Sequence, residues 1–183
     1  MVYLFLILPI ALVAWAIAAF NRLVRLRNQT KTAWADIDVQ LTRRHDLVPN
    51  LVESVKAYAG HEKALLENVA ALRSQAMAIR SPQQLGQVES QLEQGLSRLL
   101  VLQESYPDLK ANQNFLQLQA GLVQVEEHLQ YARRFYNGAV RDLNDGIQKF
   151  PDSLIANAFG FKAAEFFHAA DDARAAPQVG GLG

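Results

Sequence analysis

The chain contains no cysteine in its 183 residues. It therefore has no disulfide framework, no thiol nucleophile and no thiolate metal site, and its redox compartment is not indicated. Proline and glycine are also scarce, with six and ten residues, so few positions interrupt regular structure. Lys plus Arg and Asp plus Glu number 18 each. A neutral chain has no overall field to attract nucleic acid, and we expect no nucleic-acid partner.

A long stretch with the period of two that marks a half-buried strand is also missing. Half of the residues are hydrophobic, and most recur at intervals of three and four. This spacing predicts amphipathic helices that must bury their apolar stripes against one another.

The first twenty residues hold the one long hydrophobic run. Val2 to Phe20 is nineteen residues without a charge, close to the length that a membrane-spanning helix needs. A cleaved secretory signal is the alternative, because Ala16-Ile17-Ala18 offers a small-x-small cleavage pattern. No basic residue precedes the run, and helix-forming sequence follows it directly, so we interpret it as an anchor in the lipid bilayer.

Basic residues follow this run, and no acidic residue appears before Asp36. The basic residues are Arg22, Arg25, Arg27 and Lys31. By the positive-inside rule, this asymmetry predicts an N-terminus outside and a helical domain in the cytoplasm.

Three apolar stripes follow the anchor. The first is expected on one or two helices and comprises Trp34, Ile37, Leu41, Arg44, Val48, Leu51, Val55, Tyr58, Leu65, Val69, Leu72, Ala76 and Ile79. The second comprises Leu85, Val88, Leu92, Leu96, Leu99 and Leu102. The third comprises Phe115, Leu118, Leu122, Val125, Leu129, Ala132, Tyr136, Ala139, Leu143 and Phe150. Their spacing predicts an all-α fold, with an N-terminal transmembrane helix followed by an antiparallel bundle of long helices.

Local signals predict where the helices begin and end. Pro49 should bend or break the first helix, and Gly60 is a second weak point. Ser81-Pro82 predicts an N-cap and a new helix. Residues 154–167 are expected to form a short helix folded back over the bundle. We divide the chain into a transmembrane anchor (1–21), a helical bundle domain (22–170) and a disordered tail (171–183).

Arg44 falls on the apolar stripe of the first helix, where a charge must be paired or reach solvent. We expect it to meet a carboxylate or helix-end carbonyls of a neighbour and to set the register of the bundle; a recognition role is the alternative. The candidates for interaction or for an inter-helix network are Arg43, Arg44, His45, Asp46, Asn112, Gln113, Asn114, Arg133, Arg134, Tyr136 and Asn137.

No residue is predicted to be catalytic or to bind a cofactor or a metal. Glu165-x-x-His168 has the spacing of one half of a carboxylate-bridged di-metal site, but such sites use a second copy and further carboxylates. A metal-dependent enzyme using Glu165 and His168 is therefore kept as an alternative.

The order of several motifs resembles the LemA family of bacterial membrane proteins. The motifs are LVRLRN (23–28), AWADIDVQL (33–41), RRHDLVPNLV (43–52), YAGHE (58–62), LKANQNF (109–115), ARRFYN (132–137), FP (150–151) and FGFK (159–162). The resemblance covers nearly everything but the tail.

This resemblance implies a single-pass protein of the bacterial cell (inner) membrane with a cytoplasmic helical bundle and no established catalytic activity. It also implies companions such as membrane metallopeptidases of the HtpX kind or TPM-domain proteins. We therefore expect a non-enzymatic scaffold or adaptor that forms a homo-oligomer or engages a membrane-protein partner. A secreted helical bundle after signal cleavage remains an alternative.

Overall fold

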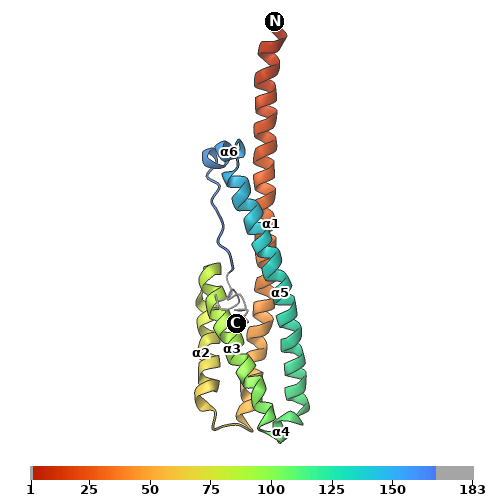
Figure 1. The fold of residues 1–183 in the computed structure, drawn as a ribbon, viewed down its shortest axis with the longest axis vertical. Helices are drawn as coiled ribbons and strands as arrows, with labels where there is room; N and C mark the ends of the chain where they lie inside the picture. The colour runs from red at the N-terminus through yellow and green to blue at the C-terminus, as the bar shows by residue number, and fades with distance from the viewer. Residues whose placement is uncertain (1, 168–183) are drawn as a thin grey trace, which may run out of the picture. The chain divides into compact units, whose positions relative to one another are not determined.

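The computed structural model describes the backbone of residues 2–167 and the side chains of residues 7–167. Within this part of the chain all regular structure is helical, which confirms the predicted all-α fold (Figure 1). The elements are α1 (Val2–Lys56), α2 (Lys63–Ala78), α3 (Pro82–Val101), the 3-10 turn η1 (Leu102–Glu104), α4 (Pro107–Lys110), α5 (Gln113–Gln148) and α6 (Asp152–Ala158). The described residues form two compact units, 2–41 with 126–166 and 42–125 with 167, and the predicted tail lies outside the described residues.

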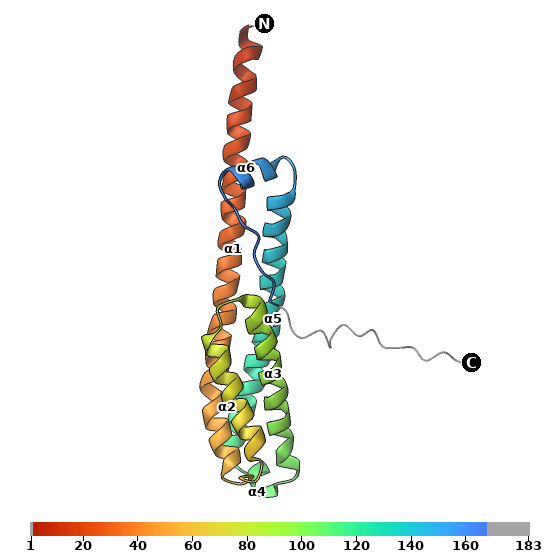
Figure 2. The same ribbon diagram turned by 90° about the vertical axis from the view of Figure 1, so that its left-hand side faces the viewer.

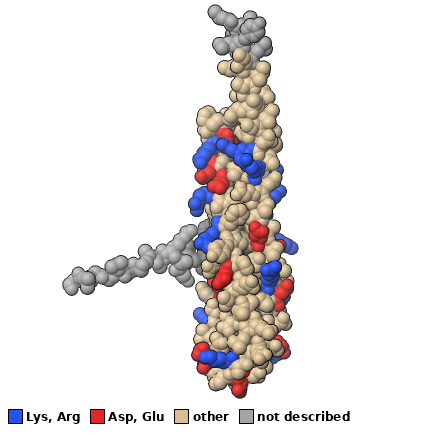
Figure 3. All heavy atoms as spheres, turned by 90° about the vertical axis from the view of Figure 1, so that its right-hand side faces the viewer, with Lys and Arg blue, Asp and Glu red and all other residues tan. Residues whose placement is uncertain are grey.

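The beginning of α1 exposes apolar side chains. The large exposed ones are Ile7, Leu8, Ile10, Leu12, Val13 and Ile17. Figure 3 shows that this part of the helix carries no charged residue. Among the described residues, α1 is the one helix that is long and apolar enough to cross a membrane. Its outward surface suits hydrocarbon better than water.

In the first unit, the part of α1 after Phe20 and the end of α5 run antiparallel, side by side (Figures 1 and 2). The Thr30 hydroxyl donates to the Ala139 carbonyl at 3.2 Å. The Trp34 and Tyr136 rings lie 5.2 Å apart. A Cβ at Gly146 would lie 3.0 Å from Leu26 Cδ1, so glycine allows the close approach of the two helices there.

The aromatic stretch after α5 forms less helix than predicted. α6 ends at Ala158, because Gly160 takes a positive φ of 68° that stops the helix. The following residues are not helical. Their backbone is held by α5: the Asn144 side chain donates to and accepts from Ala164, at 3.0 and 2.8 Å, and the Tyr136 hydroxyl donates to the Glu165 carbonyl at 2.8 Å.

In the second unit, the end of α1, α2, α3 and the beginning of α5 bury the predicted stripes against one another. The buried stripe residues of this unit are Arg44, Val48, Leu51, Val55, Val69, Leu72, Ala76, Leu85, Val88, Leu92, Leu96, Leu99, Phe115, Leu122 and Val125. Two of the predicted stripe residues are exposed instead, Tyr58 here and Phe150 in the first unit, since each lies beyond the end of its helix.

The start of α3 agrees with the sequence signals, whereas the expectation at Pro49 does not. α3 begins at Pro82, with the Ser81 hydroxyl accepting from the Gln84 amide, as predicted. The expected break at Pro49 is wrong, because α1 continues to Lys56. Proline lacks the amide that would bond to the carbonyl four residues earlier. That carbonyl belongs to His45, and it accepts a hydrogen bond from Arg73 Nε at 2.7 Å instead.

Candidate functional site

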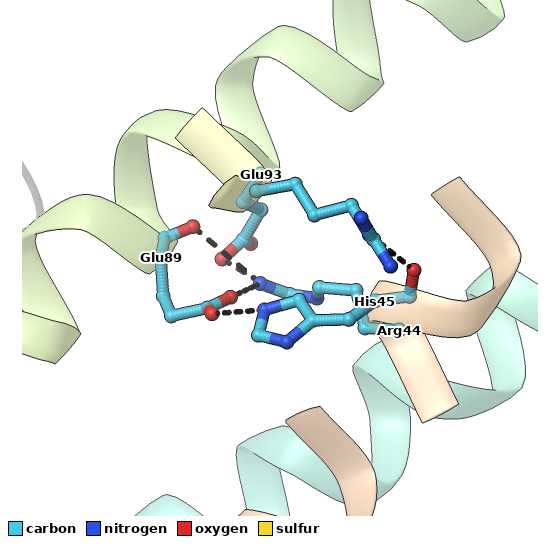
Figure 4. A network of polar contacts seen from close by, with 5 residues as sticks. Arg44, His45, Glu89 and Glu93 are labelled. Atoms are coloured by element: carbon cyan, nitrogen blue, oxygen red, sulfur yellow. Dashed lines mark hydrogen bonds and ion pairs between the residues drawn. The ribbon is translucent and has the colours of Figure 1, made fainter. Parts of the chain in front are cut away.

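A buried ion pair joins α1 to α3 in the second unit. Arg44 and Glu89 are both completely buried. Arg44 Nη1 lies 2.8 Å from Glu89 Oε2 and 3.4 Å from the Glu89 carbonyl oxygen. Figure 4 shows the Arg44 side chain reaching from α1 to the Glu89 carboxylate. Arg44 thus meets a carboxylate of a neighbouring helix.

His45 engages the other oxygen of the same carboxylate. Its Nε2 lies 2.7 Å from Glu89 Oε1. Adjacent residues of one helix normally point about 100° apart. Arg44 and His45 can both reach Glu89 because one oxygen of its carboxylate faces Arg44 and the other faces His45. Both Glu89 oxygens are therefore engaged inside the protein.

The network extends to α2 and to a second acidic residue of α3. Arg73 on α2 donates to the His45 carbonyl, which Pro49 leaves without its usual helical donor. Glu93 Oε2 lies 3.9 Å from Arg44 Nη2. The network of Arg44, His45, Arg73, Glu89 and Glu93, called here the Arg44–Glu89 network, thus connects three helices.

The surroundings keep Glu89 ionised. Burial alone would raise the pKa of its carboxyl. The hydrogen bond from His45 and the positive charge of Arg44 outweigh burial and hold this pKa below its usual value. Arg44, His45 and Glu89 are buried and bond to one another, whereas Glu93 is partly exposed, so the chemistry of the network is that of a charged link between helices.

The structure separates the other predicted residues of this cluster from the network. Arg43 and Asp46 are exposed, whereas Arg44 and His45 are buried. Arg43 and Asp46 are therefore available to solvent or to a partner.

Asn112 caps α5. Its Oδ1 accepts from the Phe115 amide at 3.0 Å, and its Nδ2 donates to the Tyr58 hydroxyl at 2.9 Å. Gln113 and Asn114 are exposed. Asn114 lies at an open hollow of about 450 Å³ between α1 and α5, whose other lining residues are Asn50, Glu53, Ser54, Gln117 and Leu118.

The candidates on the later part of α5 differ in exposure. Arg133 and Asn137 are half-buried. The Arg134 guanidinium lies 4.7 Å from the centre of the exposed Tyr131 ring. Tyr136 is buried, and burial, followed by the charge of Glu165, raises its pKa to about 12. Its hydroxyl keeps its proton and donates to the Glu165 carbonyl.

The part of the chain that the structure describes does not bring together the ligands of a metal site. Residues 2–167 contain no group of three or more His, Cys, Asp or Glu that could hold a metal ion. The Glu165 side chain is exposed, and His168 lies outside the described residues.

Our reading of the sequence missed Glu89, Arg73 and Asn144. Glu89 had a detectable signal, because it lies four residues after Leu85 and three before Leu92, on the apolar stripe of α3. A carboxylate on one apolar stripe and Arg44 on another could have been paired. Arg73 and Asn144 bond to backbone carbonyls or amides far away in the sequence, and no local pattern marks such contacts.

Comparison with known proteins identifies the family. The LemA family matches residues 33–180. Magnetosome protein MamQ 2 of Paramagnetospirillum magneticum is 24% identical over 184 residues, which cover 86% of this chain and 68% of that protein. Magnetosome protein MamQ of Magnetospirillum gryphiswaldense is 22% identical over 199 residues, covering 93% and 73%. Protein LemA of Metamycoplasma hominis is 26% identical over 155 residues, covering 82% and 69%.

The relatives come from bacteria, and with the apolar beginning of α1 they indicate a membrane-associated bacterial protein. The family match covers most of the chain and includes the motifs from Ala33 to Lys162 that carry the resemblance. The chain therefore belongs to the LemA family.

Proposed function

We propose that the protein is a non-enzymatic scaffold or adaptor, anchored in the bacterial inner membrane by residues 2–20, with its helical domain in the cytoplasm. It self-associates or binds a membrane-protein partner through an exposed face of its helices. A membrane metallopeptidase of the HtpX kind or a TPM-domain protein is the partner class that the family resemblance implies.

The observation that carries this proposal is α1. This helix begins with exposed apolar side chains and continues to Lys56. Its part after Leu41 supplies buried residues to the second unit. A helix built in this way suits a protein that holds its folded part close to a bilayer.

An exposed aromatic pair on α5 supports association with another protein. Tyr131 and Phe135 are 66% and 51% exposed and lie one helical turn apart. Arg134 lies over the Tyr131 ring. Tyrosine, phenylalanine and arginine are enriched at the centres of protein interfaces, because they supply a large contact area and, for arginine, several donors.

The proposal includes the absence of catalytic activity. Arg44, His45 and Glu89 of the Arg44–Glu89 network are buried and bond to one another. The relatives' names describe magnetosome proteins and a LemA protein and mention no reaction.

Light scattering of the full-length protein in mild detergent tests self-association. We expect a mass above that of the monomer, and we expect the double variant Tyr131→Ser, Phe135→Ser to shift towards the monomer. Val123→Ser, at an exposed valine of the same helix, is the matched control and should leave the mass unchanged.

A strict monomer across the micromolar range would remove the self-association part. Pull-down from the native membrane then decides the adaptor part: capture of a membrane protein that Tyr131→Ser, Phe135→Ser abolishes supports it, and no capture refutes it. Metal analysis of purified wild type and of the Glu165→Ala and His168→Ala variants tests the enzyme alternative.

A further inference from the structure

We infer that α6 and the residues beside it form a lipid-binding surface that inserts apolar side chains into an anionic membrane surface next to the anchor. This surface, called here the α6 surface, consists of Phe150, Leu154 and Phe159 with the nearby basic side chains of Arg22, Arg25 and Lys162. The inference rests on the proposed anchor and adds a second, peripheral contact with the same membrane.

The first argument is the position of α6 along the axis of α1. The Phe20 ring lies 4.9 Å from the Phe159 ring and 5.8 Å from the Phe161 ring, measured between centroids. Arg22 forms an ion pair with the buried Asp152, the first residue of α6. All of these contacts lie within the first unit.

Phe20 is also the last residue of the uncharged run. Nineteen helical residues cover about 30 Å, the thickness of the hydrocarbon core. When residues 2–20 occupy that core, the contacts with Phe20 and Arg22 hold α6 at the level of the lipid headgroups. Figures 1 and 2 both show α6 beside α1 at the place where the uncovered part of α1 begins.

The exposure of α6 is the second argument. Phe150, Leu154 and Phe159 are 81%, 58% and 64% exposed. Three large apolar side chains around a helix of seven residues are costly in water, but they suit the boundary between headgroups and acyl chains.

The third argument is the positive charge beside α6, which favours anionic lipids. Arg25 and Lys162 are exposed, and Arg22 remains half-exposed although it pairs with Asp152. Lys149 is also exposed, 3.7 Å from Asp145. Figure 3 shows Lys and Arg atoms, with some acidic ones, gathered where the uncharged part of α1 ends. Basic side chains at this level attract anionic headgroups.

The lack of cysteine in this chain allows a direct test with single labels. Full-length Phe150→Cys and Leu154→Cys variants carry a nitroxide and are reconstituted into vesicles of phosphatidylcholine with phosphatidylglycerol. Collision with oxygen, which concentrates in lipid, is compared with collision with a water-soluble nickel chelate. Matched labels at Ile10→Cys in the anchor and at the exposed Gln130→Cys on α5 report lipid and water. Helix content of each variant confirms folding.

We expect a several-fold higher ratio of oxygen to nickel collisions at residues 150 and 154 than at residue 130, and a fall in this ratio when phosphatidylcholine alone forms the vesicles.

A water-like ratio at residues 150 and 154 with a lipid-like ratio at Ile10→Cys would overturn the α6 surface but leave the anchor standing. A water-like ratio at Ile10→Cys would refute the anchor itself. Low collision with both reagents would mean that a second copy or another protein covers α6, which also overturns the inference. An equal ratio in neutral vesicles would overturn the preference for anionic lipid.

Discussion

Arg44 and Glu89 are two charged residues on apolar helix stripes, and each is tolerable only because of the other. Removing either charge from water costs several kcal/mol, and a 2.8 Å contact with further hydrogen bonds offsets that cost. The link is therefore geometrically demanding, because the two oxygens of Glu89 must face Arg44 and His45 at once. We propose that this demand sets the register of α1 against α3.

Replacing Arg44 by alanine should destabilise the protein by about 3 kcal/mol or more, because Glu89 is left buried without its main countercharge. Urea unfolding followed by circular dichroism measures the loss. Arg43→Ala is the matched control, since Arg43 is exposed, and it should change the free energy of unfolding by no more than about 0.5 kcal/mol.

A double replacement separates pairing from packing. Arg44→Met with Glu89→Leu removes both charges and keeps most of the volume, so it should be far less destabilising than Arg44→Ala alone. An Arg44→Ala protein that unfolds like the wild type but no longer captures its partner would show that Arg44 is a recognition residue, against our interpretation.

Acid should weaken the protein through Glu89. Its pKa in the folded protein is lowered from the usual 4.5. As the pH falls below 4.5, the unfolded chain therefore takes up a proton at Glu89 before the folded protein does, which favours unfolding. The stabilisation is fully present above that pH and is lost as the pH approaches the folded pKa.

We therefore expect the free energy of unfolding to fall more steeply with acidification in the wild type than in Glu89→Gln, which has no proton to gain there. Urea midpoints measured between neutral pH and pH values below 4.5 provide the comparison. Parallel curves for the two proteins would contradict the lowered pKa.

At the scale of elements, α5 is organised by one apolar stripe on a 36-residue helix. The Asn112 side chain caps its first turn, and Leu122, Val125 and Leu129 are buried along it. The neighbouring Val123 is about half exposed, which shows how sharply the stripe is bounded. A single turn of α5 therefore contains both a core position and a surface position.

Leu122→Asp should destabilise the second unit by more than roughly 2 kcal/mol, because the carboxylate must be buried unpaired or force the helices apart. Val123→Asp introduces the same charge at an exposed position and should have little effect. Thermal unfolding of both variants decides the matter, and a Leu122→Asp protein with an unchanged melting curve would show that this stripe is not a core.

At the scale of the whole molecule, one helix belongs to both the proposed membrane anchor and the folded body. α1 enters both compact units, so residues that suit lipid and residues that suit a protein core lie on the same element. The basic residues after Phe20 lie at the transition between them and predict the orientation of the chain.

Protease added to sealed spheroplasts should leave the helical body intact, because the positive-inside rule places residues after Arg22 in the cytoplasm. Replacing Arg22, Arg25, Arg27 and Lys31 together by glutamine should weaken this protection. Immunoblotting of the protected fragment gives the measurement, and digestion of the body in intact wild-type spheroplasts would refute the orientation.

The sequence by itself determined most of the elements. Helical periodicity, the uncharged run before Asn21 and the cap at Ser81 are local features, and each acts through residues within a few turns of one another. The all-α class and the stripes that become buried followed from them. The presence of a charge on the stripe at Arg44 was equally visible, together with the need for a partner.

Only the tertiary structure decided which partners meet. Glu89 comes 45 residues after Arg44, and Arg73 comes 28 residues after His45. Such pairs depend on how one helix slides and turns against another, which periodicity leaves open. The same holds for Pro49, where Arg73 satisfies the carbonyl of a helix expected to break. It also holds for Ala164 and Glu165, whose backbone bonds to side chains of α5 instead of continuing a helix.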